Sequence, residues 1–382
     1  MVPLREGYPH GLHSSPSRNG PKGGDGVKIA IVTDAWYPQI NGVVNTLVHT
    51  VRCLRRQNHS VQVIAPEQFR TIPCPTYPEI HLAVDVWTVG KRLEQQSPDA
   101  VHIATEGPLG FAARRWCLAR SFPFTTAYMT RFPEYIAMRF GLPPDLLTGC
   151  FRRFHGPSSG VMVSTVSLRD ELASKGFRNL KLWSRGVDTE LFAPGSADAL
   201  EAPRPRFLYV GRVAVEKNIE AFLRLDLPGS KIVTGAGPSL DHLRASYPDA
   251  LFTGAKRGEE LAAIYASCDV FVFPSCTDTF GVVMLEAAAC GLPVAAFPVQ
   301  GPLDVVRNGM TGVLDRDLGR ACIEALAIDS EACRAHALSF SWDACTEQFL
   351  DNLALEDGAA VLCGRRASQG SDGTRTGRAS CL

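Results

Sequence analysis

Arg212 and Lys217 stand five positions apart in a segment that directly follows the apolar run Phe207 to Val210. Arginine offers a planar fork of donors and lysine a compact point charge, so such a pair in a loop after a strand suits a diphosphate. On spacing alone, a pair of solvated surface charges is the alternative. The segment therefore predicts a phosphate-binding loop with Arg212 and Lys217 as its catalytic cations.

A second candidate segment follows the apolar run Val270 to Phe273 and leads into a predicted helix. It carries two carboxylates, Asp278 and Glu286, with Phe280 and Gly281 at the start of the helix. Backbone N–H groups at a helix start attract phosphate or sugar oxygens, and glycine lets a ligand approach the backbone closely. Asp278 as a simple helix cap and Glu286 as an exposed carboxylate are the alternatives. Because Glu286 lies in an alanine-rich stretch, where a carboxylate without a role is costly, we favour a binding site.

Glycines follow two further apolar runs. Gly235 and Gly237 come after Ile232 to Thr234, but Leu240 stands where a third glycine would complete a dinucleotide fingerprint. This turn therefore does not predict a dinucleotide site. Gly42 starts a predicted helix near the beginning of the chain, where its N–H can point at a phosphate.

The elements that position these residues are short apolar runs alternating with helical segments. Strands without polar alternation belong to parallel sheets that are buried on both faces. The predicted strands are Val27 to Val32, Val61 to Ala65, Ala100 to Ala104, Phe124 to Ala127 and Val161 to Thr165 in the first half, then Phe207 to Val210, Ile232 to Thr234, Asp269 to Phe273 and Pro293 to Ala296. A proline-rich stretch at 194–205 separates the two series. The sequence predicts an α/β protein with two Rossmann-like, doubly wound domains facing a central cleft, with ligands at the carboxyl ends of the strands.

The stretch from Pro274 to Val294 resembles the signature of the retaining glycosyltransferases of family four, which have the GT-B fold. The resemblance covers about residues 27 to 355. It implies that Asp278 contacts the transferred sugar and that Glu286 holds the ribose hydroxyls of a nucleotide-sugar donor. It also places the diphosphate at Arg212 and Lys217, and the nucleotide base beside the turn of Gly235 and Gly237.

The chain departs from the family pattern at two places. Asn41 precedes Gly42 where the family commonly has two glycines, and we expect asparagine to tolerate a left-handed conformation there. Met129 replaces a histidine that in the family lies near the sugar and acceptor, which removes a hydrogen-bonding and proton-exchanging group. The acceptor-side candidates are Met129, its neighbours Thr130 and Arg131, and Glu106 in a second loop expected to face the cleft.

The expected domains follow from the two strand series and the resemblance. Residues 27–200 form an N-terminal acceptor-binding domain and residues 201–340 a C-terminal donor-binding domain. Residues 341–357 form a helix that crosses back to the first domain, as in this fold. Residues 1–26 are expected to be a loose leader, without the apolar stretch of a secretion signal, and residues 358–382 a polar tail.

The resemblance implies retaining transfer of a hexose from UDP-hexose or GDP-mannose to a hydroxyl. Arg212, Lys217 and the N–H of Gly42 would stabilise the departing diphosphate, while the donor phosphate takes the proton. We expect no metal and no cofactor, since no Asp-x-Asp pair has the arrangement of metal-dependent enzymes. The alternatives are a soluble sugar or polyol acceptor, a nucleotide-sugar 2-epimerase of the same architecture, and a non-enzymatic nucleotide-sugar-binding protein.

Charge is distributed unevenly along the chain. Residues 27–200 carry 19 Lys and Arg against 14 Asp and Glu, whereas residues 201–357 carry 13 against 22. A cationic half suits an anionic partner such as a phospholipid surface, with a solvated charged face as the alternative. The Asp-Thr-Phe-Gly variant also resembles glycolipid-forming and mannosyl-transferring branches of the family.

The segment 139–155 is the predicted membrane contact. Arginines could meet lipid phosphates while apolar residues insert, as in an interfacial helix, or the helix could simply face the core. The residues are Arg139, Arg152 and Arg153, with Leu142, Leu146, Leu147, Phe151 and Phe154. Twelve cysteines without a Cys-x-x-Cys pair fit a reducing cytoplasm. We therefore expect a lipid acceptor such as diacylglycerol, a cytoplasmic protein peripheral on the inner face of the cytoplasmic membrane, and no nucleic-acid partner.

Overall fold

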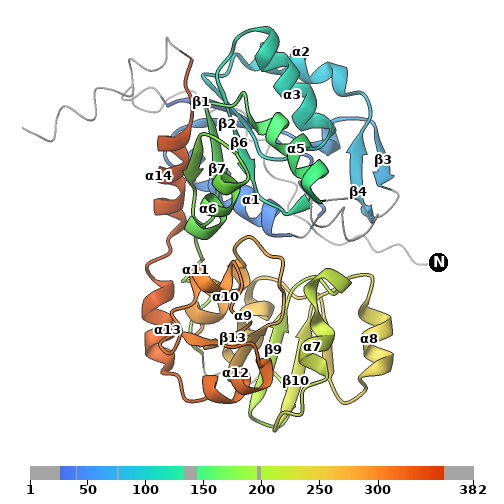
Figure 1. The fold of residues 1–382 in the computed structure, drawn as a ribbon, viewed down its shortest axis with the longest axis vertical. Coiled ribbons are helices and arrows are strands. Elements are labelled where there is room, and N and C mark those ends of the chain that lie inside the picture. Colours follow the sequence, from blue (N-terminus) through green and yellow to red (C-terminus); the bar gives the residue numbers. More distant parts are fainter. Residues whose placement is uncertain (1–25, 40, 75–76, 133–143, 196–198, 357–382) are drawn as a thin grey trace, which may run out of the picture.

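The computed structural model describes residues 26–39, 41–74, 77–132, 144–195 and 199–356. Two α/β domains lie one above the other, each built around a six-stranded sheet (Figure 1). Apart from residue 26, the expected leader and the expected tail at 358–382 lie outside the described residues. No helix within these ranges is long and apolar enough to cross a bilayer.

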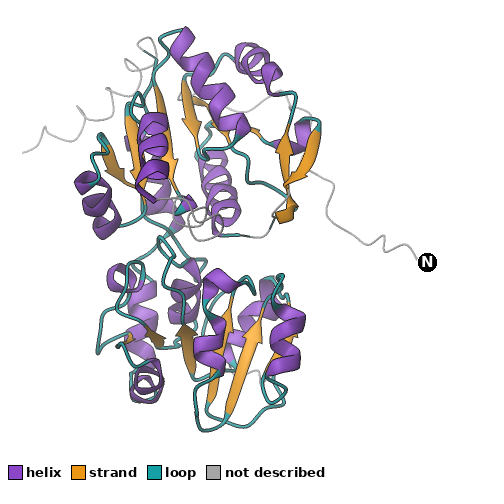
Figure 2. Cartoon of the chain, turned by 45° about the vertical axis from the view of Figure 1, so that its right-hand side comes forward, coloured by secondary structure: helices purple, strands orange, loops and turns teal. Residues whose placement is uncertain are grey.

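The N-terminal sheet has the order β2-β1-β5-β6-β7-β8, and every neighbouring pair is parallel. Its core strands are buried along their whole length, as expected for a sheet with helices on both faces (Figure 2). The strands are β1 (Lys28–Val32), β2 (Ser60–Ile64), β5 (Ala100–Ile103), β6 (Phe124–Tyr128), β7 (Gly160–Val163) and β8 (Leu180–Leu182). The helices are α1 (Gly42–Arg56), α2 (Val89–Gln96), α3 (Pro108–Ala119), α5 (Pro144–His155) and α6 (Val166–Ser174).

An antiparallel hairpin, β3 (Thr71–Cys74) with β4 (Tyr77–Ala83), stands beside the N-terminal sheet. It is flanked by two short 3₁₀ helices, η1 (Pro66–Gln68) and η2 (Val86–Thr88). The sequence analysis did not predict the hairpin, because Pro73 and the polar residues around it hide the apolar pattern of a strand.

The C-terminal sheet repeats the design with the order β11-β10-β9-β12-β13-β14, again with parallel neighbours. Its strands are β9 (Arg206–Val210), β10 (Ser230–Thr234), β11 (Leu251–Gly254), β12 (Val270–Phe273), β13 (Val294–Ala296) and β14 (Gly312–Leu314). Its helical segments are η3 (Val215–Lys217), α7 (Ile219–Leu223), α8 (Leu240–Ser246), α9 (Gly258–Ala266), α10 (Val282–Ala289), α11 (Pro302–Val305), α12 (Leu318–Ala325) and α13 (Ser330–Ala337). The predicted fold class, two doubly wound Rossmann-like domains, is confirmed.

The last helix, α14 (Trp342–Asn352), packs on the N-terminal domain rather than on the domain that precedes it. The indole of Trp342 stacks on the imidazole of His49 in α1, with ring centroids 4.6 Å apart. Phe349 is fully buried in the same apolar cluster as Leu47 of α1. The chain thus crosses between the domains a second time, and α14 ties them together.

Candidate active site

The two domains meet through the loops at the carboxyl ends of their strands. Thr279, in the loop between β12 and α10, donates its hydroxyl to the backbone oxygen of Met129, at 3.0 Å. Its own backbone oxygen accepts a hydrogen bond from Ser164 Oγ, at 2.9 Å. Met129 follows β6 and Ser164 follows β7, so the carboxyl ends of both sheets face each other here. The predicted site residues of both domains lie on these loops or on the helices that the loops begin.

Lys217 and Asp278, predicted from separate segments, form an ion pair. Their Nζ and Oδ1 atoms lie 2.5 Å apart, and each side chain is 20% exposed. Asp278 Oδ2 is buried and has no hydrogen-bond partner within the described part of the chain. Because the cap of α10 is Gly281 and not Asp278, the helix-cap interpretation of this carboxylate is wrong. The geometry brings a cation and a carboxylate with spare acceptor capacity to the same point of the domain junction.

Arg212 shares the loop after β9 with Lys217 and is half-buried. Its backbone oxygen accepts a hydrogen bond from the hydroxyl of Tyr209, at 2.8 Å, which fixes the start of the loop against the strand. The end of the loop is fixed by Asn218, whose amide donates to the backbone oxygen of Pro274, at 3.1 Å. Both ends of the cationic loop are therefore anchored to the C-terminal domain.

Glu286 lies within α10 and is only 8% exposed. Burial raises the pKa of its carboxyl from 4.5 to about 7, against the opposing effect of a hydrogen bond that Tyr265 donates to Oε2, at 3.0 Å. The interpretation of Glu286 as a solvent-exposed carboxylate is wrong. Near neutral pH, this carboxyl is divided between its protonated and charged forms.

Gly281 precedes α10 in a left-handed conformation, with φ of 84°. A Cβ atom there would lie 2.7 Å from Met284 Cε and 3.0 Å from the ring of Phe273, so both conformation and space select glycine. The adjacent Phe280 is buried in the C-terminal core. The signature loop is therefore held rigidly where it enters the helix.

The turn after β10 packs against the loop after β9. Val213 N donates to Ala236 O, at 2.9 Å, and Ser239 N donates to Val213 O, at 3.0 Å. A Cβ atom on Gly235 would lie 1.8 Å from Gly211 O, and one on Gly237 would lie 2.3 Å from Val213 O. Close backbone packing thus explains both glycines, and their place beside the nucleotide base stays a prediction.

Gly42 is the first residue of α1, and a Cβ atom on it would meet nothing within 4 Å. The space above this helix start is open to a ligand. Asn41 has φ of −156°, so the expected left-handed conformation is wrong. It caps the helix instead: its Oδ1 accepts the N–H of Val44, at 3.0 Å, which extended backbone and a short amide side chain allow.

Glu106 does not present a free carboxylate to the domain junction. Its side chain is 4% exposed, and Oε1 lies 3.1 Å from Nε2 of His155. The other ring nitrogen, Nδ1, lies 2.9 Å from Thr126 Oγ1. This buried polar chain holds the carboxylate within the N-terminal domain, and the place of the Glu106 loop at the cleft stays a prediction.

Asp34, which the sequence analysis missed, is a buried carboxylate that holds the start of α3. Its Oδ1 accepts the N–H of Leu109 and its Oδ2 the hydroxyl of Thr105, each at 2.9 Å. Burial raises its pKa despite these hydrogen bonds. Asp34 therefore joins the loop after β1 to the start of α3 and shapes this side of the junction. The only sequence signal was an acidic residue two positions after a strand.

Met129 contributes its backbone to the junction but not its side chain. The side chain is 8% exposed and belongs to the apolar cluster that includes Leu47 and Trp183. Beside it, Thr130 is half-buried. Arg131 forms an ion pair with Glu171, at 2.5 Å. The segment therefore offers the acceptor a backbone edge and an arginine that already has a carboxylate partner.

The predicted membrane helix is largely packed. Phe154 is 2% exposed in the core of the N-terminal domain, and Phe151 is half-buried against a second apolar cluster. Arg152 donates to the backbone oxygen of Lys175, at 3.1 Å. The insertion of Phe154 and Phe151 into a bilayer is therefore wrong, and the core-facing interpretation holds for both. Arg139, Leu142 and the side chain of Leu146 lie outside the described residues.

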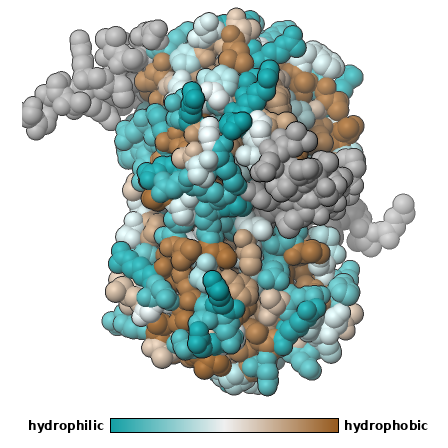
Figure 3. Space-filling model, in the orientation of Figure 1, coloured by the Kyte–Doolittle hydropathy of each residue, from teal (hydrophilic) through white to brown (hydrophobic). Residues whose placement is uncertain are grey.

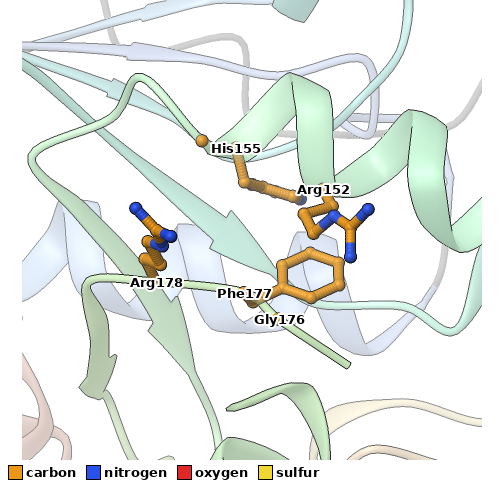
Figure 4. Close-up of a pocket in the computed structure, with 6 residues that line it drawn as sticks. Arg152, His155, Gly176, Phe177 and Arg178 are labelled. Carbon is orange, nitrogen blue, oxygen red and sulfur yellow. The ribbon is translucent and has the colours of Figure 1, made fainter. Parts of the chain in front are cut away.

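A cavity of about 430 Å³ opens beside this helix (Figure 4). Arg152, His155, Phe177 and Arg178 are among its lining residues. They lie at the end of α5 and after α6, near the amino ends of β7 and β8 and thus on the opposite edge of the sheet from the domain junction. The cavity adds no residue to the candidate active site.

One Asp-x-Asp pair follows a strand that the sequence analysis did not predict. Asp315 and Asp317 come directly after β14. Asp317 caps α12 by accepting the N–H of Arg320, at 3.0 Å, and Asp315 forms an ion pair with the same arginine. Both carboxylates are thus engaged at the start of α12. Among the described residues, no group of three or more His, Cys, Asp and Glu is placed to hold a metal ion.

Residues 40–191 match the family described as Glycosyltransferase Family 4, and residues 204–327 match the family described as Glycosyl transferases group 1. A GDP-mannose-dependent alpha-mannosyltransferase of Mycobacterium tuberculosis is 31% identical over 76% of this chain and 84% of its own length. The chain belongs to the family 4 glycosyltransferases. Like its relatives, this family 4 glycosyltransferase transfers a sugar from a nucleotide-sugar donor.

Other relatives differ in the sugar that their names state. A sulfoquinovosyl transferase of Arabidopsis thaliana is 30% identical over 73% of this chain and 61% of its own length. Among solved structures, sucrose-phosphate synthase of Thermosynechococcus elongatus has a TM-score of 0.70 at 21% identity, over 89% of this chain and 99% of its own. HepE of Anabaena, in complex with UDP and glucose, has a TM-score of 0.64 at 17% identity, over 85% and 98%. These likenesses confirm the GT-B fold of this family 4 glycosyltransferase.

Proposed function

We propose that this enzyme transfers mannose from GDP-mannose to a hydroxyl of a membrane lipid such as diacylglycerol, with retention and without a metal ion. The observation that carries the transferase chemistry is the Lys217–Asp278 pair at the domain junction, with Glu286 buried behind it. Three relatives named as GDP-mannose-dependent alpha-mannosyltransferases support the donor. A second candidate donor, a UDP-hexose, is favoured by the likeness to HepE with bound UDP and glucose.

The transfer breaks the bond between the anomeric carbon and the diphosphate and forms a bond to the acceptor oxygen on the same face. The acceptor proton passes to a phosphate oxygen of the leaving group, so no separate base is needed. Arg212, Lys217 and the open helix start at Gly42 supply positive potential for the departing diphosphate, which is the work that a metal ion does elsewhere. Asp278 Oδ2 would accept a hydrogen bond from the transferred sugar.

Exposed apolar side chains at the domain junction support an acceptor with an apolar part. They occur on loops or helix starts at the carboxyl ends of strands in both domains: Tyr37 (55% exposed), Phe132 (37%), Val166 (48%), Val215 (86%) and Leu303 (57%). Figure 3 shows hydrophobic residues at the surface of the C-terminal domain close to the junction. A sugar or polyol acceptor gains little from such a surface, whereas an acyl chain buries it.

The membrane contact follows from the same surface and from the charge of the N-terminal domain. Each exposed basic residue near an anionic bilayer contributes about 1 kcal/mol, and salt weakens this contribution. Because Phe151 and Phe154 are packed, we place the apolar contact at the junction loops. Arg152 and Arg153 are exposed but lie at the opposite edge of the sheet, so we assign the basic contribution to the net positive charge of residues 27–200. The enzyme would then be peripheral on the cytoplasmic face of the membrane.

The test follows radiolabelled mannose from GDP-mannose in the presence of EDTA, with diacylglycerol in vesicles that contain or lack anionic lipid. We expect label in the organic phase, more of it with anionic vesicles, and less at high salt. Efficient transfer to soluble sugars or polyols, with no lipid product, would contradict the lipid acceptor and leave the glycosyltransferase assignment intact. A strict need for added divalent metal would contradict the metal-free mechanism.

A matched pair of variants tests the apolar surface. Leu303→Ser changes a leucine that is 57% exposed at the junction, whereas Leu326→Ser changes one that is 40% exposed after α12, away from the junction loops. We expect Leu303→Ser to raise the KM for diacylglycerol in vesicles and Leu326→Ser to leave it unchanged. Equal effects of the two substitutions would remove the support that this surface gives to a lipid acceptor.

A further inference from the structure

The signature loop between β12 and α10 is held by its own domain on one side of Asp278 and by the other domain on the opposite side. Before Asp278, Thr277 donates to the backbone oxygen of Glu216, at 3.3 Å, within the C-terminal domain. After Asp278, Thr279 forms hydrogen bonds with the N-terminal domain at Met129 and Ser164. Asp278 therefore lies between a residue that contacts the C-terminal domain and a residue that contacts the N-terminal domain.

The backbone of the loop is also enclosed on the side of Gly301. A Cβ atom on Gly301 would lie 3.2 Å from the backbone oxygens of both Asp278 and Phe280. Just beyond Gly301, Asp304 of α11 accepts hydrogen bonds from the backbone N–H and the hydroxyl of Ser167, at the start of α6. The loop is thus enclosed between α11 and the N-terminal domain, and Thr279 is its hydrogen-bonded link across the junction.

We propose that Thr279 is a positioning residue that sets Asp278 against the acceptor-side loop when the two domains meet. Thr279 neighbours Asp278 in the chain, so a shift of its hydroxyl contact moves the carboxylate that is paired with Lys217. The N-terminal partner is the backbone oxygen of Met129, which is present whatever side chain stands there. The link therefore persists although methionine replaces the histidine of the family pattern. This inference rests on the sugar-contacting role of Asp278 in the proposed function.

Removal of the Thr279 hydroxyl should affect kcat but not donor binding. The loop of Arg212 and Lys217 is anchored at both ends within the C-terminal domain, and Glu286 lies within α10, so of the proposed nucleotide contacts only the ion-pair partner of Lys217 depends on Thr279. The position of Asp278 relative to the acceptor-side loop does depend on it. Loss of the link should therefore lower kcat while the KM for the donor and the Kd for the nucleoside diphosphate stay unchanged.

The experiment compares Thr279→Val, which keeps the shape and removes the hydroxyl, with Thr279→Ser, which keeps the hydroxyl. Loss of one neutral hydrogen bond corresponds to roughly a fivefold to tenfold change. In the whole protein without donor, we expect amide hydrogen exchange of peptides spanning Ser164 to Leu168 to be faster by about that factor in Thr279→Val. With GDP-mannose, kcat should fall by the same factor. Thr279→Ser should restore both.

Thr88→Val is the matched control, because the Thr88 hydroxyl donates to the backbone oxygen of Asp85, at 3.1 Å, within the N-terminal domain. It should alter neither kcat nor exchange at 164–168. Unchanged exchange in Thr279→Val, a rise in donor KM equal to the fall in kcat, or failure of Thr279→Ser to rescue would each overturn the proposal. Because exchange needs no donor, its result stands apart from any failure of GDP-mannose as the substrate.

Discussion

Binding of a nucleoside diphosphate should release a proton if Glu286 holds the ribose. Burial raises the pKa of this carboxyl to about 7, so in the free enzyme near pH 6 it is mostly protonated. Ribose hydroxyls donate hydrogen bonds, and a charged carboxylate accepts them better than a neutral carboxyl does. Binding therefore favours the charged form and lowers the pKa of Glu286. The perturbation that tests this is a change of pH between 6 and 8.

The magnitude follows from the position of the pKa. One pH unit below a pKa of about 7, roughly a tenth of the carboxyl is charged. If only the charged form binds the ribose well, the Kd for GDP should be about tenfold weaker at pH 6 than at pH 8. Close to one proton per nucleotide should be released at pH 6, and almost none at pH 8.

Calorimetry of GDP binding in buffers of different ionisation enthalpy measures the released protons directly. Because the terminal phosphate of GDP also titrates near pH 6, Glu286→Gln provides the reference: it meets the same nucleotide but has no titrating carboxyl. We expect the difference between wild type and Glu286→Gln to reach about one proton at pH 6. Asp278→Asn, which changes the other carboxylate of the signature, should keep the wild-type release. Identical proton release in wild type and Glu286→Gln would refute the ribose-binding role.

The same pKa predicts an effect on stability with a definite sign. A carboxyl whose pKa rises on folding contributes stability below its unfolded value of 4.5, and this contribution is lost as the pH rises through about 7. The difference corresponds to about 3 kcal/mol of unfolding free energy. Thermal unfolding of the free enzyme should therefore show Glu286→Gln gaining stability over wild type between pH 5 and pH 8. A constant difference across this range would contradict the buried, neutral carboxyl.

Four further substitutions test the site. Arg212→Ala or Lys217→Ala should each lower turnover by roughly a hundredfold or more, the scale of one lost transition-state charge contact, and wild-type rates in steady-state kinetics would exclude a role at the diphosphate. Asp278→Asn should lower kcat while calorimetric affinity for the free nucleoside diphosphate stays near wild type; an equal loss of both would contradict its assignment to the sugar. Met129→His should lower the unfolding free energy by about 1–3 kcal/mol, since it buries an imidazole in an apolar cluster, and an unchanged Tm would show that the side chain can reach solvent.

The fold class was predictable because the central strands of both sheets are continuous apolar runs. β5 and β6 lie in the middle of one sheet and β9 and β12 in the middle of the other, and their patterns left no competing interpretation. The missed strands β8, β11 and β14 lie at sheet edges and, unlike the equally short β5 and β12, have half-buried or exposed positions that interrupt a continuous apolar run. Because β14 was not predicted, Asp315 and Asp317 were not recognised as a pair that follows a strand.

The helix at 144–155 shows why the membrane contact could not be predicted residue by residue. Apolar side chains at helical spacing, with arginines among them, are equally typical of an interfacial helix and of a core helix with basic ends. What decides between them is whether another element covers the apolar face. Phe154 packs edge-on against Phe111 of α3, with ring centroids 4.8 Å apart, a contact between residues 43 positions apart. Local periodicity contains no information about such a partner.

The two carboxylates of the signature illustrate what spacing can and cannot predict about chemistry. Asp278 and Glu286 are eight residues apart, and the sequence indicated a site without distinguishing their electrostatics. The fold places Asp278 beside the ammonium of Lys217 and places Glu286 inside α10, where the hydroxyl of Tyr265 donates a hydrogen bond to its carboxyl. Glu286, whose pKa burial raises to about 7, becomes charged as hydrogen-bond donors reach it. The burial of Glu286 therefore predicts that proton release accompanies nucleotide binding and belongs to this carboxyl.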